Sequence, residues 1–131
     1  IFMGEKDFQQ LYLIKKFIKN RYKSKIYSCK TIRDKNYIAL STRNFLLSKK
    51  DLIMVGKISR ILKKTRQKIK KTSSPLLYLN ILKKELIKKF KIKIDYLELC
   101  NEHNLNKSNL NKKYKIMFAF YIKKIRLIDN F

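Results

Sequence analysis

Two stretches in the second half of the chain repeat apolar residues at helical spacing, and each needs an apolar surface to pack against. The first, from about Lys49 to Lys71, has lysines and arginines opposite a stripe formed by Val55, Ile58, Ile61, Leu62, Thr65 and Ile69. The second begins with Ser74-Pro75, a cap followed by proline at the first helical position. It is expected to run to about Phe90, with an inner face of Leu79, Leu82, Leu86 and Phe90. Together with 45% hydrophobic residues, this pattern predicts a folded core rather than a disordered chain.

Three short strands are predicted after these helices. Ile92, Ile94 and Tyr96 are expected on the inner face of the first, because they alternate with Lys93, Asp95 and Leu97. An Asn- and Lys-rich loop is expected over Asn101–Lys113. The last two strands are expected near Lys115–Tyr121 and Ile125–Asp129. Two helices followed by three strands indicate a small α+β domain with an antiparallel sheet.

The beginning of the chain predicts a strand, a helix and a second strand. Ile1–Met3 is a short apolar run that ends at Gly4, as at the end of a buried strand. Asp7 is expected to cap a helix over Phe8–Lys19, whose inner face consists of Phe8, Leu11, Ile14 and Ile18. Lys25–Ser28 is the expected second strand. This order is typical of a βαβ piece of a parallel sheet.

These patterns divide the chain near Phe45–Lys49, into residues 1–47 and residues 48–131. The overall class is α/β, with an incomplete parallel sheet in the first part. Because the sequence starts within an expected strand, we expect it to be part of a longer one.

The net charge of +25 permits two interpretations. A strongly basic chain suggests a nucleic-acid-binding module. However, the lysines are spread over the whole chain among Ile, Asn, Tyr and Phe, all encoded by A/T-rich codons, so genome composition also explains them. We therefore expect no specific nucleic-acid partner, although salt-sensitive binding to polyanions would follow from the charge alone.

The sequence offers few signals for membranes, metals or disulfides. Neither a leader-like start nor an apolar run of membrane-spanning length is evident. Cys29 and Cys100 lack CxxC spacing, which favours free thiols without excluding a disulfide. His103, the single histidine, has no carboxylate or cysteine in register, so a solvated residue explains it better than a metal ligand or base. We expect a soluble, cytoplasmic protein without a protein-held metal.

Gly4-Glu5-Lys6-Asp7 combines features of a nucleotide-binding corner. Gly4 lets a ligand approach the backbone, and a helix N-terminus offers N–H groups to an anion. Lys6 supplies a mobile charge for phosphate, and Asp7 an acceptor for a ribose hydroxyl. A turn glycine, a solvated lysine and an ordinary cap would give the same pattern, so spacing alone does not decide.

Ser41-Thr42-Arg43-Asn44 is a second candidate for binding phosphate. Its hydroxyls and guanidinium offer several donors to phosphate oxygens. A polar turn before a helix would look the same. No P-loop and no GxGxxG stands in the sequence to support either segment.

Taken together, four segments resemble the pantothenate synthetase family in the correct order. Residues 2–11 resemble its FGxKDxQQL segment, and residues 38–44 its LALSSRN segment at nearly the same separation. Residues 95–99 resemble a strand of its C-terminal domain, and residues 126–130 its terminal RLIDN. The resemblance covers the whole chain but only the second half of a family member. It implies the end of a Rossmann-like nucleotidyltransferase domain in residues 1–47, followed by the small α+β domain.

The resemblance implies an ATP-dependent ligase that condenses pantoate with β-alanine through pantoyl adenylate, giving pantothenate, AMP and pyrophosphate. Lys6 and Arg43 would act on the phosphates and the developing charge, and Gln10 would bind pantoate. The remaining ATP contacts would come from Gly4, Glu5, Asp7, Ile32, Leu40, Ser41 and Thr42. Mg²⁺ would accompany ATP, and full-length family members are typically homodimers.

This sequence departs from the family pattern at several points. Thr42 replaces the second serine, Lys30 stands where proline is usual, and Tyr37 stands where glycine is usual. With one histidine, the 131 residues contain no counterpart of the family's HxGH segment. We therefore expect these residues alone to be inactive.

Overall fold

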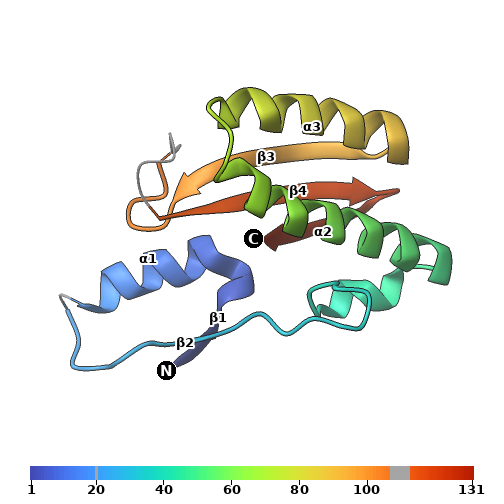
Figure 1. Cartoon of the computed structure of the whole chain (residues 1–131). Coiled ribbons are helices and arrows are strands. Elements are labelled where there is room, and N and C mark those ends of the chain that lie inside the picture. The colour runs from blue at the N-terminus through green and yellow to red at the C-terminus, as the bar shows by residue number, and fades with distance from the viewer. Residues whose placement is uncertain (20, 107–112) are drawn as a thin grey trace.

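The computed structural model describes residues 1–19, 21–106 and 113–131. It contains a two-stranded parallel sheet and a three-stranded antiparallel sheet in the order β3-β4-β5. Figure 1 shows the parallel pair with α1 at one end of the molecule, and α2 and α3 packed against the antiparallel sheet. The α/β class and the small α+β unit expected from the sequence are confirmed. The boundary between residues 47 and 48 stays a prediction.

The first unit has the predicted βαβ order. Strand β1 (Phe2–Gly4) pairs in parallel with β2 (Tyr27–Cys29), and α1 (Phe8–Lys19) connects them. The expected cap at Asp7 is wrong, because a 3-10 turn, η1 (Glu5–Asp7), precedes α1 and begins after Gly4. Of the expected inner face of α1, only Leu11 is buried, and Phe8, Ile14 and Ile18 are half-buried.

Helix α2 (Lys49–Ile69) starts with a reciprocal cap. The Ser48 hydroxyl accepts a hydrogen bond from the Asp51 N–H, and the Asp51 carboxylate accepts one from the Ser48 N–H. Lys123 Nζ lies 2.7 Å from the same carboxylate. The hydrogen bonds from Lys123 and Ser48 hold the pKa of Asp51 below its usual value. The start of α2 is thereby fixed to the turn between the last two strands.

Helix α3 (Pro75–Phe90) has proline in its first turn, as expected. Ser74 occupies the cap position but makes no side-chain cap hydrogen bond. The predicted inner faces of α2 and α3 are buried, apart from Ile61 and Phe90, which are partly buried against the same core. No helix in the described ranges is long and apolar enough to cross a membrane.

The antiparallel sheet consists of β3 (Lys93–Asn101), β4 (Tyr114–Ile122) and β5 (Ile125–Asn130). Its pairing shifts by one residue between Ile94 and Tyr96. This bulge reverses the inward side of β3, so Leu97 and Leu99 are buried, whereas Tyr96, predicted to be inward, is only half-buried. The loop predicted over Asn101–Lys113 begins later, because β3 continues through Asn101. Its residues 107–112 lie outside the described residues.

One glycine sets the distance between α2 and the preceding loop. A Cβ at Gly56 would lie 3.0 Å from both the Cβ and the backbone oxygen of Asn36. Asn36 cannot easily retreat, because its N–H donates to the Asp34 carboxylate at 2.9 Å. The close approach of α2 to the residue 34–37 turn therefore requires glycine.

We predict that Gly56→Ala lowers the free energy of unfolding by about 1 kcal/mol, because the added methyl group displaces the turn. In an ordinary helix interior the same change raises stability by about 1 kcal/mol. Urea unfolding would measure the difference, with the exposed Lys57→Ala as a control expected within about 0.5 kcal/mol of the parent. A stabilised Gly56→Ala protein would contradict the close approach.

Candidate functional site

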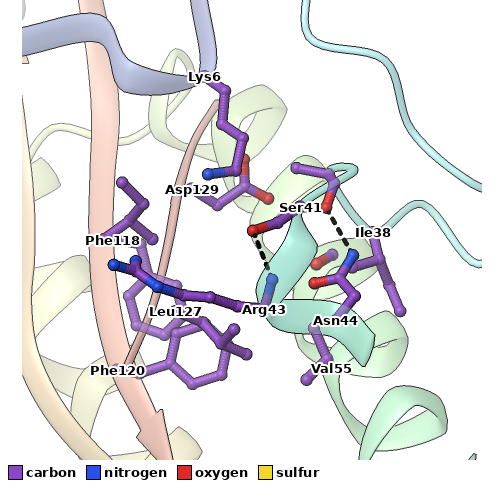
Figure 2. A pocket seen from close by; sticks show the side chains of 13 residues that line it. Lys6, Ile38, Ser41, Arg43, Asn44, Val55, Phe118, Phe120, Leu127 and Asp129 are labelled. Carbon is purple, nitrogen blue, oxygen red and sulfur yellow. Dashed lines mark hydrogen bonds between the residues drawn. The ribbon is translucent and has the colours of Figure 1, made fainter. Parts of the chain in front are cut away.

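The candidate site lies where β5 contacts both η1 and η2 (Thr42–Leu46). Figure 2 shows Lys6 and Arg43 entering one pocket from these two elements, beside Ser41, Asn44 and Asp129. Its apolar lining includes Val55, Phe118, Phe120 and Leu127. Cationic and hydroxyl side chains thus meet above the apolar core, from segments about 35 residues apart in the chain.

Lys6 is placed by a contact with the end of the chain. The Asn130 carboxamide Nδ2 donates to the backbone oxygens of Glu5 and Lys6, both at 2.8 Å. Asn130 is 5% exposed, so these hydrogen bonds are shielded from water. They hold η1 against β5 and direct the Lys6 side chain into the pocket.

The second segment is ordered by its own side chains. The Ser41 hydroxyl accepts a hydrogen bond from the Arg43 N–H at 3.3 Å and caps η2. The Asn44 amide donates to the Ala39 oxygen at 3.0 Å. In the ranges that the structure describes, no carboxylate pairs with Lys6 or Arg43. Both cations are therefore available to an anion.

Arg33 anchors the loop that leads to Ser41. Its guanidinium binds both carboxylate oxygens of Asp129 at 2.8 Å and donates to the backbone oxygens of Tyr37 and Asn130 at 3.1 and 3.0 Å. It also lies 4.7 and 4.6 Å from the ring centroids of Tyr37 and Phe131. The Arg33 and Asp129 side chains are 13% and 7% exposed, so this bidentate pair is well shielded from solvent.

The structure gathers only some of the predicted site residues. Lys6, Ser41 and Arg43 line the pocket, whereas Gly4, Asp7, Gln10 and Thr42 are exposed and do not. Glu5 instead borders a neighbouring basic hollow that contains Lys30, Lys63, Arg66 and Lys115. Ile32 and Leu40 are 70% and 53% exposed, and the Leu40 N–H donates to the Ile32 oxygen at 3.0 Å.

Sequence reasoning missed the residues that support these side chains. Arg33, Asp129 and Asn130 were not predicted as site residues, and Asn44 was predicted only as part of the Ser41–Asn44 segment. The available signal was the polar Asp129-Asn130 pair at the end of an apolar strand. Two buried polar residues in such a place need hydrogen-bonding partners, although the sequence does not say which.

A comparison with known families decides the relationship. The family model for pantoate-beta-alanine ligase matches residues 1–131. The chain belongs to this family.

Individual relatives agree with this assignment. The pantothenate synthetase of Flavobacterium psychrophilum is 32% identical over 98% of the chain and 47% of the relative. The pantothenate synthetase structure from Thermus thermophilus has a TM-score of 0.84 at 24% identity, covering 99% of this chain and 48% of that one. A pantoate-beta-alanine ligase from Francisella tularensis, solved with beta-gamma ATP and beta-alanine, has a TM-score of 0.67 at 34% identity, with 99% and 42% covered. The chain spans about half the length of the curated relatives it matches.

The unusual tyrosine at position 37 occupies a left-handed backbone conformation, with φ at 71°. Glycine, which the family resemblance places here, adopts this conformation without steric cost. Tyr37 is held by its N–H bond to the Asp34 oxygen at 2.9 Å and by the stacking of its ring on Arg33. The departure from glycine therefore adds backbone strain and an aromatic contact at one position.

We predict that Tyr37→Gly is more stable than Tyr37→Ala by about 1 kcal/mol, because alanine keeps the left-handed strain without the ring contact. The order should reverse at Tyr78, a half-buried position within α3, where alanine favours the helix by about 1 kcal/mol. Thermal or urea unfolding of the four variants measures both differences. If the alanine variant were the more stable one at both positions, the left-handed backbone of residue 37 would not explain the result.

Proposed function

We propose that this chain forms one wall of the ATP site of a pantoate–β-alanine ligase. The observation that supports this most strongly is the meeting of Lys6, Ser41 and Arg43 at one pocket. A flexible ammonium, a hydroxyl and a guanidinium suit the oxygens of a triphosphate. The Francisella relative, solved with beta-gamma ATP and beta-alanine, supports the same small-molecule chemistry.

The exposed residues around the pocket are assigned to the rest of the substrates. A Cβ built on Gly4 meets nothing within 4 Å, so the backbone there is open to a ribose. Asp7, which is exposed three residues further along the chain, is assigned to the ribose as an acceptor. The neighbouring Ile32 and Leu40 leave apolar surface for the adenine. Thr42 follows Ser41 as a further hydroxyl, and Gln10, exposed on α1, is assigned to pantoate.

The proposed reaction has two steps. A pantoate carboxylate oxygen attacks the α-phosphorus of ATP and pyrophosphate leaves; the amine of β-alanine then attacks the acyl carbon and AMP leaves. Neither step needs a protein nucleophile, so the chain positions reactants and stabilises phosphate charge through Lys6 and Arg43. Mg²⁺ would be held by the ATP phosphates, since no group of three metal-ligating side chains occurs among the described residues and Asp129 is paired with Arg33.

Two variants test the phosphate contacts. We predict that Lys6→Gln and Arg43→Gln each weaken ATP binding about tenfold at physiological ionic strength, because each removes a charged hydrogen-bond donor to phosphate. Lys88→Gln is the matched control, since it removes one charge from an exposed position on α3. Calorimetric titration gives the three affinities.

Equal losses in all three proteins would mean that ATP binds only through net charge. That outcome would favour the alternative function, a basic nucleic-acid-binding module. Salt-sensitive DNA binding alone would not confirm that function, because the net charge of +25 produces such binding by itself.

We further predict that the 131 residues alone do not turn over, because they contain no HxGH segment. A coupled assay of AMP release with pantoate, β-alanine and ATP measures this. Appreciable turnover would show that the residues described are sufficient for catalysis. Homodimerisation and a cytoplasmic location stay predictions.

A further inference from the structure

The last strand holds both candidate phosphate-binding segments through two adjacent residues. Asn130 donates both carboxamide hydrogen bonds to η1, at the Glu5 and Lys6 oxygens. Its own N–H donates to the Asp129 carboxylate at 2.8 Å, and its backbone oxygen accepts from Arg33. The carboxamide Nδ2 of Asn130 is therefore directed to η1, and its backbone N–H and oxygen to the Arg33–Asp129 pair.

Asp129 reaches the other segment through Arg33. Arg33 forms an antiparallel bridge with Ala39, two residues before Ser41. The Asn44 amide returns to the Ala39 oxygen, so the start of η2 is fixed to the same point. A shift of Asp129 would accordingly move the backbone that carries Ser41 and Arg43.

The polarity of the Asn130 contact makes its carboxamide necessary. Two carbonyl oxygens face Nδ2, and carbonyls accept but do not donate. A carboxylate of the same shape would lose both hydrogen bonds and place negative charge against two acceptors. Asn130 does not line the pocket, so its effect on a ligand passes through Lys6.

We propose that Asn130 and Asp129 are positioning residues of the ATP site: Asn130 sets the place of Lys6, and Asp129, through Arg33, sets that of Ser41 and Arg43. The assignment of the ligand rests on the proposed function. The last strand of the α+β unit thereby fixes the separation between two groups that bind one triphosphate. Anion affinity then depends on contacts about 125 residues apart in the chain.

Asn130→Asp tests the first half of this proposal in the 131-residue chain. Asn101→Asp is a matched control with the same charge change, because Asn101 uses its side-chain oxygen to accept the His103 N–H at 2.7 Å, a role that aspartate retains. Inorganic tripolyphosphate is the probe, and hydrogen exchange reports on residues 2–11 separately from β3 and β4.

We expect Asn130→Asp to bind tripolyphosphate about tenfold more weakly than Asn101→Asp, as the loss of one well-placed charged contact implies. Exchange should become faster at residues 2–11 and stay unchanged in β3 and β4. A folded Asn130→Asp protein with control-like exchange at residues 2–11 overturns the proposal, as does equal acceleration over the whole sheet.

Arg33→Lys tests the second half and serves if Asn130→Asp fails to fold. It keeps the charge but cannot form the bidentate pair with Asp129. Hydrogen exchange should become faster over residues 32–44, and tripolyphosphate should bind about tenfold more weakly, as in Asn130→Asp. Unchanged exchange over residues 32–44 would overturn the positioning role of Asp129. If the parent chain and Lys6→Gln bind tripolyphosphate equally well, the proposed function is wrong. The positioning roles of Asn130 and Asp129 are then tested by hydrogen exchange at residues 2–11 and 32–44 alone.

Discussion

The guanidinium of Arg33 joins the loop before η2 to the last strand of the antiparallel sheet. It reaches Asp129 with two hydrogen bonds, the backbone of Tyr37 and Asn130 with two more, and lies against two aromatic rings. A guanidinium that is largely shielded from water is costly to leave without its hydrogen-bonding and charged partners. The loop before η2 therefore has its observed shape only when the final strand is in place.

The helices and the order of the strands could be predicted because each depends on local pattern. The stripe from Val55 to Ile69 needs only helical spacing and a core to cover it, and Pro75 fixes where the next helix starts. The bulge beside Asp95 could not be predicted. The pattern of alternating apolar and polar residues assumes that β3 pairs without interruption, and no glycine or proline in β3 indicates an extra residue. The positive φ of Tyr37 was equally hidden, since tyrosine does not signal that conformation.

Residues that bind phosphate through their own side-chain chemistry could be predicted from the sequence. Residues that support them through contacts with distant parts of the chain could not. Lys6, Ser41 and Arg43 could be recognised as phosphate-binding types, and they do line one pocket. The supporting contacts from Asn130 to η1 span about 125 residues, and Arg33 to Asp129 spans 96. A single sequence contains no measure of the distance between such residues. Asp129 and Asn130 were therefore recognised only as part of the family resemblance over residues 126–130, and Arg33 was not recognised at all.

The small parallel sheet has a consequence for how the chain behaves in solution. Within the described residues β1 and β2 pair only with each other, and Phe2 and Tyr27 stack at 5.3 Å while remaining 77% and 53% exposed. Unpaired strand edges with apolar side chains are templates for self-association. The charge of +25 opposes this by mutual repulsion between molecules, and salt screens that repulsion. Repulsion between molecules is therefore strongest at low ionic strength, and added salt weakens this barrier to pairing between strand edges.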